Sequence, residues 1–200
     1  YSGTGVAGNA VTGLGFSSEL VFVMDGSNQA AVFRSSADSN SYDFTKNAYT
    51  TAITSLDSDG FTLGTDQQAN KNGDTYYYVA WNDIAGLMDV GSYTGNGADN
   101  RNITGVGFAP EWVMVQSSSG ADPAVHHTEA QGAATDVTNY FTGTTSSNPG
   151  NRIQQLQADG FQVGSDADVN ANTTAFSYMA WRQETPPTIS AISNQTTPED

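Results

Sequence analysis

The chain has 200 residues and a formal net charge of −15, because 21 acidic side chains face only 6 basic ones. Such a surface repels phosphate backbones and anionic lipid, so we expect no nucleic-acid partner. No apolar run approaches the ~20 residues of a membrane span, and we expect no membrane insertion. The chain has no cysteine, which excludes disulfides, thiolate metal sites and cysteine nucleophiles.

The sequence is duplicated. Tyr1–Val23 recurs as Tyr93–Val115 with 10 of 23 positions identical, and Leu56–Trp81 recurs as Leu156–Trp181 with 11 of 26 identical. Self-similarity of this kind is the signature of modules that are built in series.

The two copies predict two domains, over residues 1–89 and 90–183. A unit of ~90 residues is long enough to bury a small core of its own. After Trp181 the composition changes, and Thr185-Pro186-Pro187 reads as a stiff hinge. We expect residues 184–200 to be a Pro-containing linker into a further, truncated β-domain, or an extended strand.

The first unit opens with glycines that are typical of turns, where a positive φ is needed. The apolar runs after them are too short for helices and rich in β-branched and aromatic residues, and Asp59-Gly60 is a hairpin signal. The polar stretch Asp25–Ser55 differs in length from its counterpart, which is typical of surface loops. The expected strands are Leu20–Met24, Phe61–Gly64 and Tyr76–Trp81.

The second unit has the same order, with a polar stretch over Gln116–Gln155 and a second hairpin signal at Asp159-Gly160. No window has the periodicity of an amphipathic helix. We therefore predict an all-β fold, a tandem antiparallel β-sandwich made of two related repeats. The expected strands are Trp112–Val115, Phe161–Gly164 and Phe176–Trp181.

Four recurring segments carry a resemblance: Tyr93–Gly97, Gly107–Val115, Asp59–Gly64 and Tyr78–Trp81. Together they resemble a module of phage tail-associated and large bacterial surface proteins. That module is similar to concanavalin-A-like, or laminin-G-like, jelly-roll sandwiches. The resemblance covers Tyr1 to Trp181 as two copies.

Pro187–Asp200 resembles the opening of the cadherin-like or immunoglobulin-like repeats of giant bacterial adhesins. The two resemblances imply an extracellular location, at a cell or virion surface, with glycan binding, adhesion or assembly as roles. They carry over no catalytic residue. The copies depart from each other at Ser17-Ser18, where the second copy has Ala109-Pro110.

Carboxylates gather around the first Asp-Gly turn, as they do in many calcium sites. The candidate metal ligands are Asp57, Asp59 and Asp66, and calcium is the one cofactor that they suggest. The second copy has Gln157 in place of Asp57, and the long loop and distal Glu of an EF-hand are absent. The alternative is that Asp59 bonds to its own turn ahead of Gly60.

Aromatic rings suit the apolar faces of sugars, so exposed aromatic residues are candidate glycan contacts. We select Tyr77 and Tyr140, whose counterparts are not aromatic or lie in the variable stretch. Trp81, Trp112 and Trp181 offer the same surface. However, Trp81 and Trp181 occupy equivalent ends of the closing strand, which favours a place in the core.

No catalytic residue is predicted. His126-His127 is the only histidine pair, with Glu129 two residues on, but adjacent side chains of a strand point to opposite faces. No serine lies in a G-x-S-x-G context. Glu19 and Glu111 are equivalent and flank predicted strands, so a hydrolase with two close carboxylates ranks last.

The sequence thus predicts a non-enzymatic extracellular module of a large surface or filament-forming protein, acting by spacing, surface docking or self-assembly. Its partners would be a cell-surface glycan or protein, or other copies of itself. The alternative is a carbohydrate-binding, lectin-like module, assisted by calcium. We expect any specific site where the repetition fails. The candidate assembly strand, which would add to an open sheet edge, holds Thr188, Ile189, Ala191 and Ile192.

Overall fold

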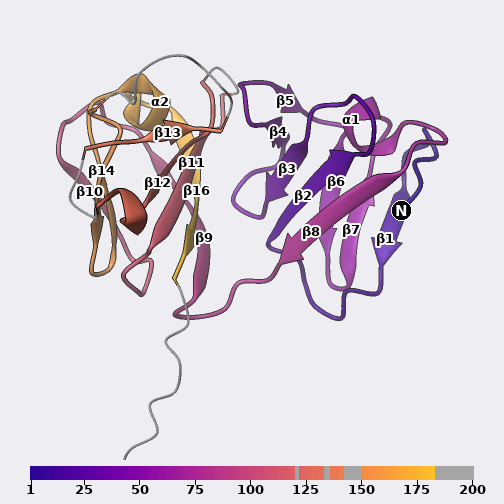
Figure 1. Cartoon of the computed structure of the whole chain (residues 1–200), viewed down its shortest axis with the longest axis horizontal. Helices are drawn as coiled ribbons and strands as arrows, with labels where there is room; N and C mark the ends of the chain where they lie inside the picture. The colour runs from indigo at the N-terminus through magenta and orange to yellow at the C-terminus, as the bar shows by residue number, and fades with distance from the viewer. Residues whose placement is uncertain (120–121, 133–135, 142–149, 183–200) are drawn as a thin grey trace, which may run out of the picture.

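Each copy of the duplicated sequence forms its own sandwich of a three-stranded and a five-stranded antiparallel sheet (Figure 1). The fold is seen in a computed structural model that describes residues 1–119, 122–132, 136–141 and 150–182. The predicted all-β, tandem antiparallel sandwich is confirmed. Among the described residues, no helix is long and apolar enough to cross a membrane.

In repeat 1 the outer sheet has the strand order β1–β7–β6, and the inner sheet has the order β5–β4–β3–β2–β8. A one-turn helix, α1, connects β7 to β8. The elements are β1 (Asn9–Thr12), β2 (Leu20–Asp25), β3 (Val32–Ser35), β4 (Ser41–Asp43), β5 (Ala48–Tyr49), β6 (Ile53–Asp57), β7 (Gly60–Leu63), α1 (Gln67–Asn70) and β8 (Tyr76–Trp81).

Repeat 2 has the same arrangement, with an outer sheet ordered β10–β15–β14 and an inner sheet ordered β13–β12–β11–β16–β9. The fifth strand of this inner sheet is β9, at the edge beyond β16, whereas β5 of repeat 1 has no counterpart among the described residues. Repeat 2 also has a short 3-10 helix, η1. The elements are β9 (Met88–Thr94), β10 (Arg101–Thr104), β11 (Trp112–Ser117), β12 (Val125–Thr128), η1 (Glu129–Gln131), β13 (Asn139–Tyr140), β14 (Ile153–Gln157), β15 (Gly160–Val163), α2 (Ala167–Asn170) and β16 (Ala175–Trp181).

The Asp-Gly signals do form hairpins, β6–β7 and β14–β15. Glycine is required at the start of β7, because a Cβ on Gly60 would lie 1.9 Å from the carbonyl oxygen of Val11 on β1. Only a residue without a side chain lets the hairpin pair with β1 at this point.

A buried asparagine anchors the glycine-rich opening of each repeat. The side chain of Asn70 accepts from the Thr4 N–H at 2.8 Å and donates to the carbonyl oxygen of Val6 at 2.9 Å. Asn170 bonds Asn96 and Ala98 in the same way. The asparagines therefore recur because they satisfy backbone groups that the irregular opening leaves without strand partners.

The two inner sheets face each other, so the molecule has four layers with the outer sheets at its ends (Figure 1). β2 shows the consequence, since Val21 and Val23 point into the core of repeat 1 whereas Leu20 and Phe22 point toward repeat 2. We call the side chains between the inner sheets the inter-repeat cluster. Its members are Leu20, Phe22, Phe33, Tyr42, Phe44, Trp81, Met88, Val90, Trp112, Met114, Ala124, Phe141, Met179 and Trp181.

Aromatic rings join the two repeats within this cluster. Trp81 meets Trp181 with ring centroids 5.9 Å apart, and Phe44 meets Phe141 at 4.7 Å. The Tyr42 hydroxyl donates to the carbonyl oxygen of Ser118 at 3.1 Å, and burial raises the pKa of this tyrosine to about 12. The two repeats are therefore held together by aromatic side chains of both repeats, which their contact removes from water.

The structure differs from the sequence-based description of the elements in three details. The stretch Asp25–Ser55 is not a surface loop, because β3, β4 and β5 lie in it and complete the inner sheet. The boundary expected between Asp89 and Val90 falls inside β9, which pairs along its whole length with β16. The helices α1 and α2 lack any periodic signal because each is a single turn, begun by the side chain of Asp66 or Asp166.

Replacing Met114 with alanine should lower the free energy of unfolding by about 2–5 kcal/mol, because the side chain is fully buried in the inter-repeat cluster. Met24→Ala is the matched control, since Met24 is 56 % exposed, and its effect should stay within about 0.5 kcal/mol. Guanidinium denaturation monitored by tryptophan fluorescence checks both variants. Equal losses in the two variants would contradict the proposed role of the cluster.

Candidate functional site

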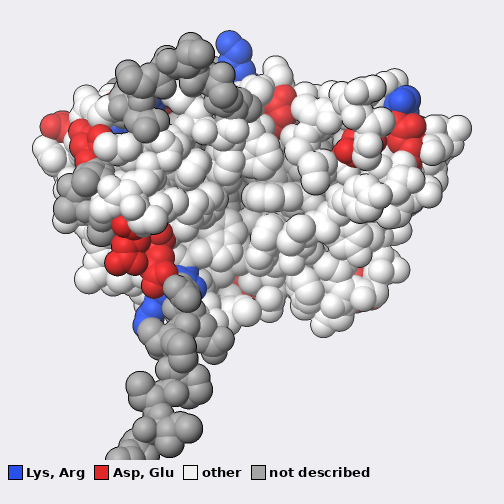
Figure 2. Space-filling model, viewed as in Figure 1, with Lys and Arg blue, Asp and Glu red and all other residues white. Residues whose placement is uncertain are grey.

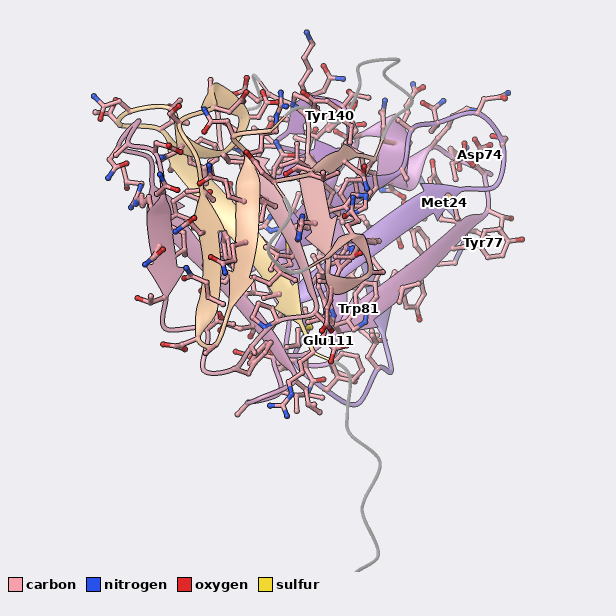
Figure 3. The ribbon with its side chains drawn as sticks, turned by 60° about the vertical axis from the view of Figure 1, so that its left-hand side comes forward. Met24, Asp74, Tyr77, Trp81, Glu111 and Tyr140 are labelled. Atoms are coloured by element: carbon pink, nitrogen blue, oxygen red, sulfur yellow. The ribbon has the colours of Figure 1, made fainter. Side chains whose placement is uncertain are left out.

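An apolar patch is exposed on repeat 1, where β2 and β8 extend beyond the inter-repeat cluster. It surrounds a hollow of about 230 Å³. Met24 on β2 and Tyr77 on β8 lie close together, and Trp81 lies further along β8 toward the other repeat (Figure 3). We call this surface the β8 patch. Its exposed side chains are Met24, Tyr77 and Val79, and its hollow is also lined by Ala31 and by Phe22 and Phe44 at the border of the inter-repeat cluster.

Strand alternation places the patch on the same face as the inter-repeat cluster. Tyr77, Val79 and Trp81 share one face of β8, yet only Trp81 reaches repeat 2. Tyr77 and Val79 are 62 % and 53 % exposed. The patch is thus the part of this β8 face that repeat 2 leaves in solvent, whereas the same face is covered by repeat 2 at Trp81.

The equivalent positions of repeat 2 are buried. Ser177 and Met179, which correspond to Tyr77 and Val79, are 1 % and 0 % exposed. Gln116, which corresponds to Met24, is 0 % exposed. Three apolar side chains are therefore exposed in repeat 1 at positions whose counterparts in repeat 2 are buried, although two of those counterparts, Ser177 and Gln116, are polar.

Charged groups border the patch without entering it. Lys71 and Asp74 form an ion pair at 2.7 Å in the turn that precedes β8, and Asp74 lies near Met24 and Tyr77 in Figure 3. Hydrogen bonds from the Ser27 hydroxyl and from backbone N–H groups lower the pKa of Asp25, at the end of β2. On the face that Figure 2 shows, few charged side chains lie over the junction of the repeats.

Asp59 holds two loops together. Its carboxylate accepts from the backbone N–H groups of Gly13 at 3.1 Å and Gly15 at 2.6 Å. Asp159 accepts in the same way from Gly105 and Gly107. The recurring aspartate thus joins the β6–β7 or β14–β15 hairpin to the glycine loop, rather than bonding its own turn as the alternative reading expects.

The other two predicted metal ligands lie apart from this contact. Asp57 accepts from the Thr62 hydroxyl at 2.7 Å, and Asp66 caps α1 by accepting from the Gln68 N–H. Within the described ranges, no group of three His, Cys, Asp or Glu side chains lies close enough together to hold a metal ion. The structure therefore does not bring Asp57, Asp59 and Asp66 into one group.

The two candidate glycan contacts differ. Tyr77 presents an exposed ring on the β8 patch. Tyr140 is half-buried, its hydroxyl donates to Asp168 at 2.8 Å, and the Arg152 guanidinium lies over its ring with its carbon 4.9 Å from the centroid. One face of the Tyr140 ring is thus already covered. The three tryptophans pack in the inter-repeat cluster, in agreement with the core interpretation.

The adjacent histidines of β12 point to opposite faces. The His127 ring is buried, and its Nδ1 lies 2.5 Å from the carbonyl oxygen of Val137. His126 faces the other way and stacks on Trp112, with ring centroids 5.6 Å apart, beside Phe141. Burial lowers the pKa of His126, and the neighbouring His127 adds to this effect.

An open hollow of about 670 Å³ on repeat 2 is lined by Glu111, Glu129 and Arg182, among others. The strand entry here matches repeat 1, since the N–H groups of Glu19 and Glu111 both donate to the last residue of the closing strand at 2.8 Å. Glu19 and Glu111 therefore occupy equivalent positions at the strand entry of the two repeats, and Glu129 is exposed.

Sequence reasoning missed Met24 and Val79. The signal for Met24 was present, because Gln116 takes its place in the second copy, whereas Val79 is matched by Met179, which is also apolar. Thr188, Ile189, Ala191 and Ile192, the candidate assembly strand, lie outside the described residues.

The stability of the protein should fall in mild acid because of His126. Its folded-state pKa is lowered, so the unfolded state binds the proton more readily, and stability that is complete above the ordinary value of 6.5 is lost as the pH falls below it. Denaturant unfolding between pH 7.5 and 5.5 should show a smaller decrease for His126→Phe than for the parent chain. Identical pH dependences would rule out this origin.

Comparison with known proteins gives one family. The model of a domain of unknown function, DUF7483, matches residues 1–88 and again residues 85–196. No curated protein and no solved structure matches the chain. The two matches coincide with the two sandwiches, and they cover most of the sequence. The chain therefore belongs to the DUF7483 family and carries two copies of its domain.

Proposed function

We propose that the protein is a non-enzymatic structural or adhesion module of a large surface protein, which acts by docking or assembly through the β8 patch. The observation that carries this proposal is the exposure of Met24, Tyr77 and Val79 side by side on a strongly acidic protein. Contiguous apolar surface of this kind usually serves a protein contact. The surrounding acidic surface keeps the module soluble and limits unspecific association.

The inter-repeat cluster supports a spacing role. Because Trp81 and Phe44 pack against Trp181 and Phe141, the two sandwiches move as one block rather than as beads on a flexible linker. Within a large surface protein, a block of this kind would keep its neighbouring domains at a fixed distance from each other.

The extracellular or virion-surface location rests on the resemblance to jelly-roll modules of phage tail-associated and bacterial surface proteins. The acidic surface and the lack of cysteine agree with such a location and with the absence of a nucleic-acid partner. A catalytic role finds less support, because Glu111 and Glu129 line an open hollow rather than the buried surroundings that tune a catalytic acid.

The alternative is a carbohydrate-binding module, and Tyr77 is the observation that favours it. Its exposed ring borders the hollow of the β8 patch, where the apolar face of a sugar could stack. Calcium could assist such binding through carboxylates such as Asp57, Asp59 or Asp66, although these lie in separate contacts.

A bead assay tests the proposal, because multivalent display amplifies weak contacts. Beads coated with the chain should cluster, and the double variant Met24→Ser, Tyr77→Ser should reduce clustering by about tenfold. Val6→Ser is the matched control, since Val6 is an exposed apolar residue (66 %) outside the patch.

A glycan array separates the alternative from the proposal. Lectin activity predicts array binding that is lost with Tyr77→Ala and kept with Met24→Ser, with or without calcium. Clustering that persists in the double variant would refute assembly through the patch.

A further inference from the structure

The contact between the two repeats has the form of a dimer interface. Trp81 meets Trp181, its counterpart at the end of the closing strand, with ring centroids 5.9 Å apart. Phe44 and Phe141, which directly follow the equivalent strands β4 and β13, meet at 4.7 Å. Contact between equivalent residues is the mark of an isologous interface, in which both partners use the same patch. The inner sheet of each repeat is therefore a surface that fits the inner sheet of another repeat.

The two inner surfaces are related but not interchangeable. The first and third residues of β2 are Leu20 and Phe22, whereas those of β11 are Trp112 and Met114. All four side chains belong to the inter-repeat cluster, and the aromatic and aliphatic positions are exchanged between the repeats. Because packed interiors tolerate little change of volume or shape, repeat 1 fits repeat 2 better than it fits another repeat 1.

One short connector, residues 82–87, links the two repeats between β8 and β9 (Figure 1). Among the described residues, no strand of one repeat pairs with a strand of the other, so side chains carry the contact. The same side-chain contacts can form whether the two repeats belong to one chain or to two. This is the structural condition for domain exchange between chains.

The connector is folded back on itself in the closed chain. The N–H groups of Leu87 and Met88 both donate to the carbonyl oxygen of Ile84, at 2.8 and 2.9 Å. The turn needs Gly86, whose φ of +81° is costly for a residue with a side chain. Unfolding of this turn would release a connector that spans about 20 Å when extended.

Like charges gather where the connector folds. Asp83 lies on the connector, Glu19 directly precedes β2 of repeat 1, and Asp89 lies on β9 of repeat 2. Burial raises the pKa of Asp83, and the carboxylates of Asp89 and Glu19 raise it further. This repulsion favours an extended connector, in which Asp83 can lie further from both groups.

We propose that the inner sheet of repeat 1 binds repeat 2 of a second copy of the chain, so that two chains exchange repeats. Each pair of sandwiches would then hold repeat 1 of one chain and repeat 2 of the other, with the inter-repeat cluster unchanged and both connectors extended. The inference goes beyond assembly through the β8 patch, because it uses the buried cluster and needs neither Met24 nor Tyr77. The occupant is a second copy because its repeat 2 carries the surface that fits.

Cross-linking between chains tests the exchange, and the absence of cysteine from the sequence gives a clean background. Burial raises the pKa of Asp122 in repeat 2, and the Lys46 ammonium of repeat 1 opposes this effect, so these side chains lie on opposite sides of the junction. Chains with Lys46→Cys and chains with Asp122→Cys are mixed in guanidinium and refolded together at about 1 mM, near the effective concentration of a tethered repeat. A short bis-maleimide then joins neighbouring thiols.

Exchange predicts a mixed product, which joins position 46 of one chain to position 122 of the other. It should exceed the products that join two like positions by at least about fivefold, because only exchange holds unlike positions of two chains together. Refolding from guanidinium removes kinetic trapping of the closed chains. A statistical mixture of all three products, or no cross-linked chains at all, would overturn the inference.

Two variants of the connector sharpen the result. Gly86→Pro cannot adopt the positive φ of the turn but suits an extended connector, so it should raise the yield of the mixed product by about fivefold. Gly86→Asn is the matched control, because asparagine tolerates a positive φ, and its yield should stay within about twofold of the parent chain. Equal yields from the two variants would contradict exchange through this connector.

The double variant Met24→Ser, Tyr77→Ser separates the exchange from the β8 patch. Neither side chain belongs to the inter-repeat cluster, so this variant should give as much mixed product as the parent chain when it carries the same cysteine substitutions. Loss of the mixed product in the double variant would assign the contact between chains to the β8 patch and would overturn the exchange. Bead clustering that is lost while the mixed product remains would support both proposals.

Discussion

The structure depends on the face-to-face packing of two inner sheets, one from each repeat. This contact buries side chains on both faces of β2 and β11, so each repeat adds a shared apolar layer to the core of its own sandwich. Leu20 and Met114 show the constraint, since both are fully buried although they point away from the sandwich to which they belong. Small sandwiches bury little surface, and sharing a third apolar layer compensates for this.

The same contact creates the candidate site because it is offset. The inner sheet of repeat 2 is covered along β11 and β16, whereas the inner sheet of repeat 1 is left in solvent at Met24, Tyr77 and Val79. The far end of β8 therefore keeps an apolar face in solvent.

The residues that recur in both repeats have a different role from those that do not recur. Asn70 and Asp59 recur because each bonds backbone groups of an irregular loop, and both copies of the fold contain such a loop. Met24 and Tyr77 do not recur, and they line the surface proposed for assembly. The surface proposed for assembly thus lies where the repetition fails.

The amino-acid sequence by itself determined the duplication, the all-β class, the closing strands and the Asp-Gly hairpins, because these depend on local periodicity and turn chemistry. It did not reveal β3 to β5, whose apolar residues are interspersed with polar ones, nor α1 and α2, which are too short for periodicity. Only the tertiary structure decided that Trp81 is covered while Tyr77 is exposed on the same strand face. The physical reason is that exposure along β8 is set by the reach of the second repeat and by the strand beside it, neither of which is encoded within β8.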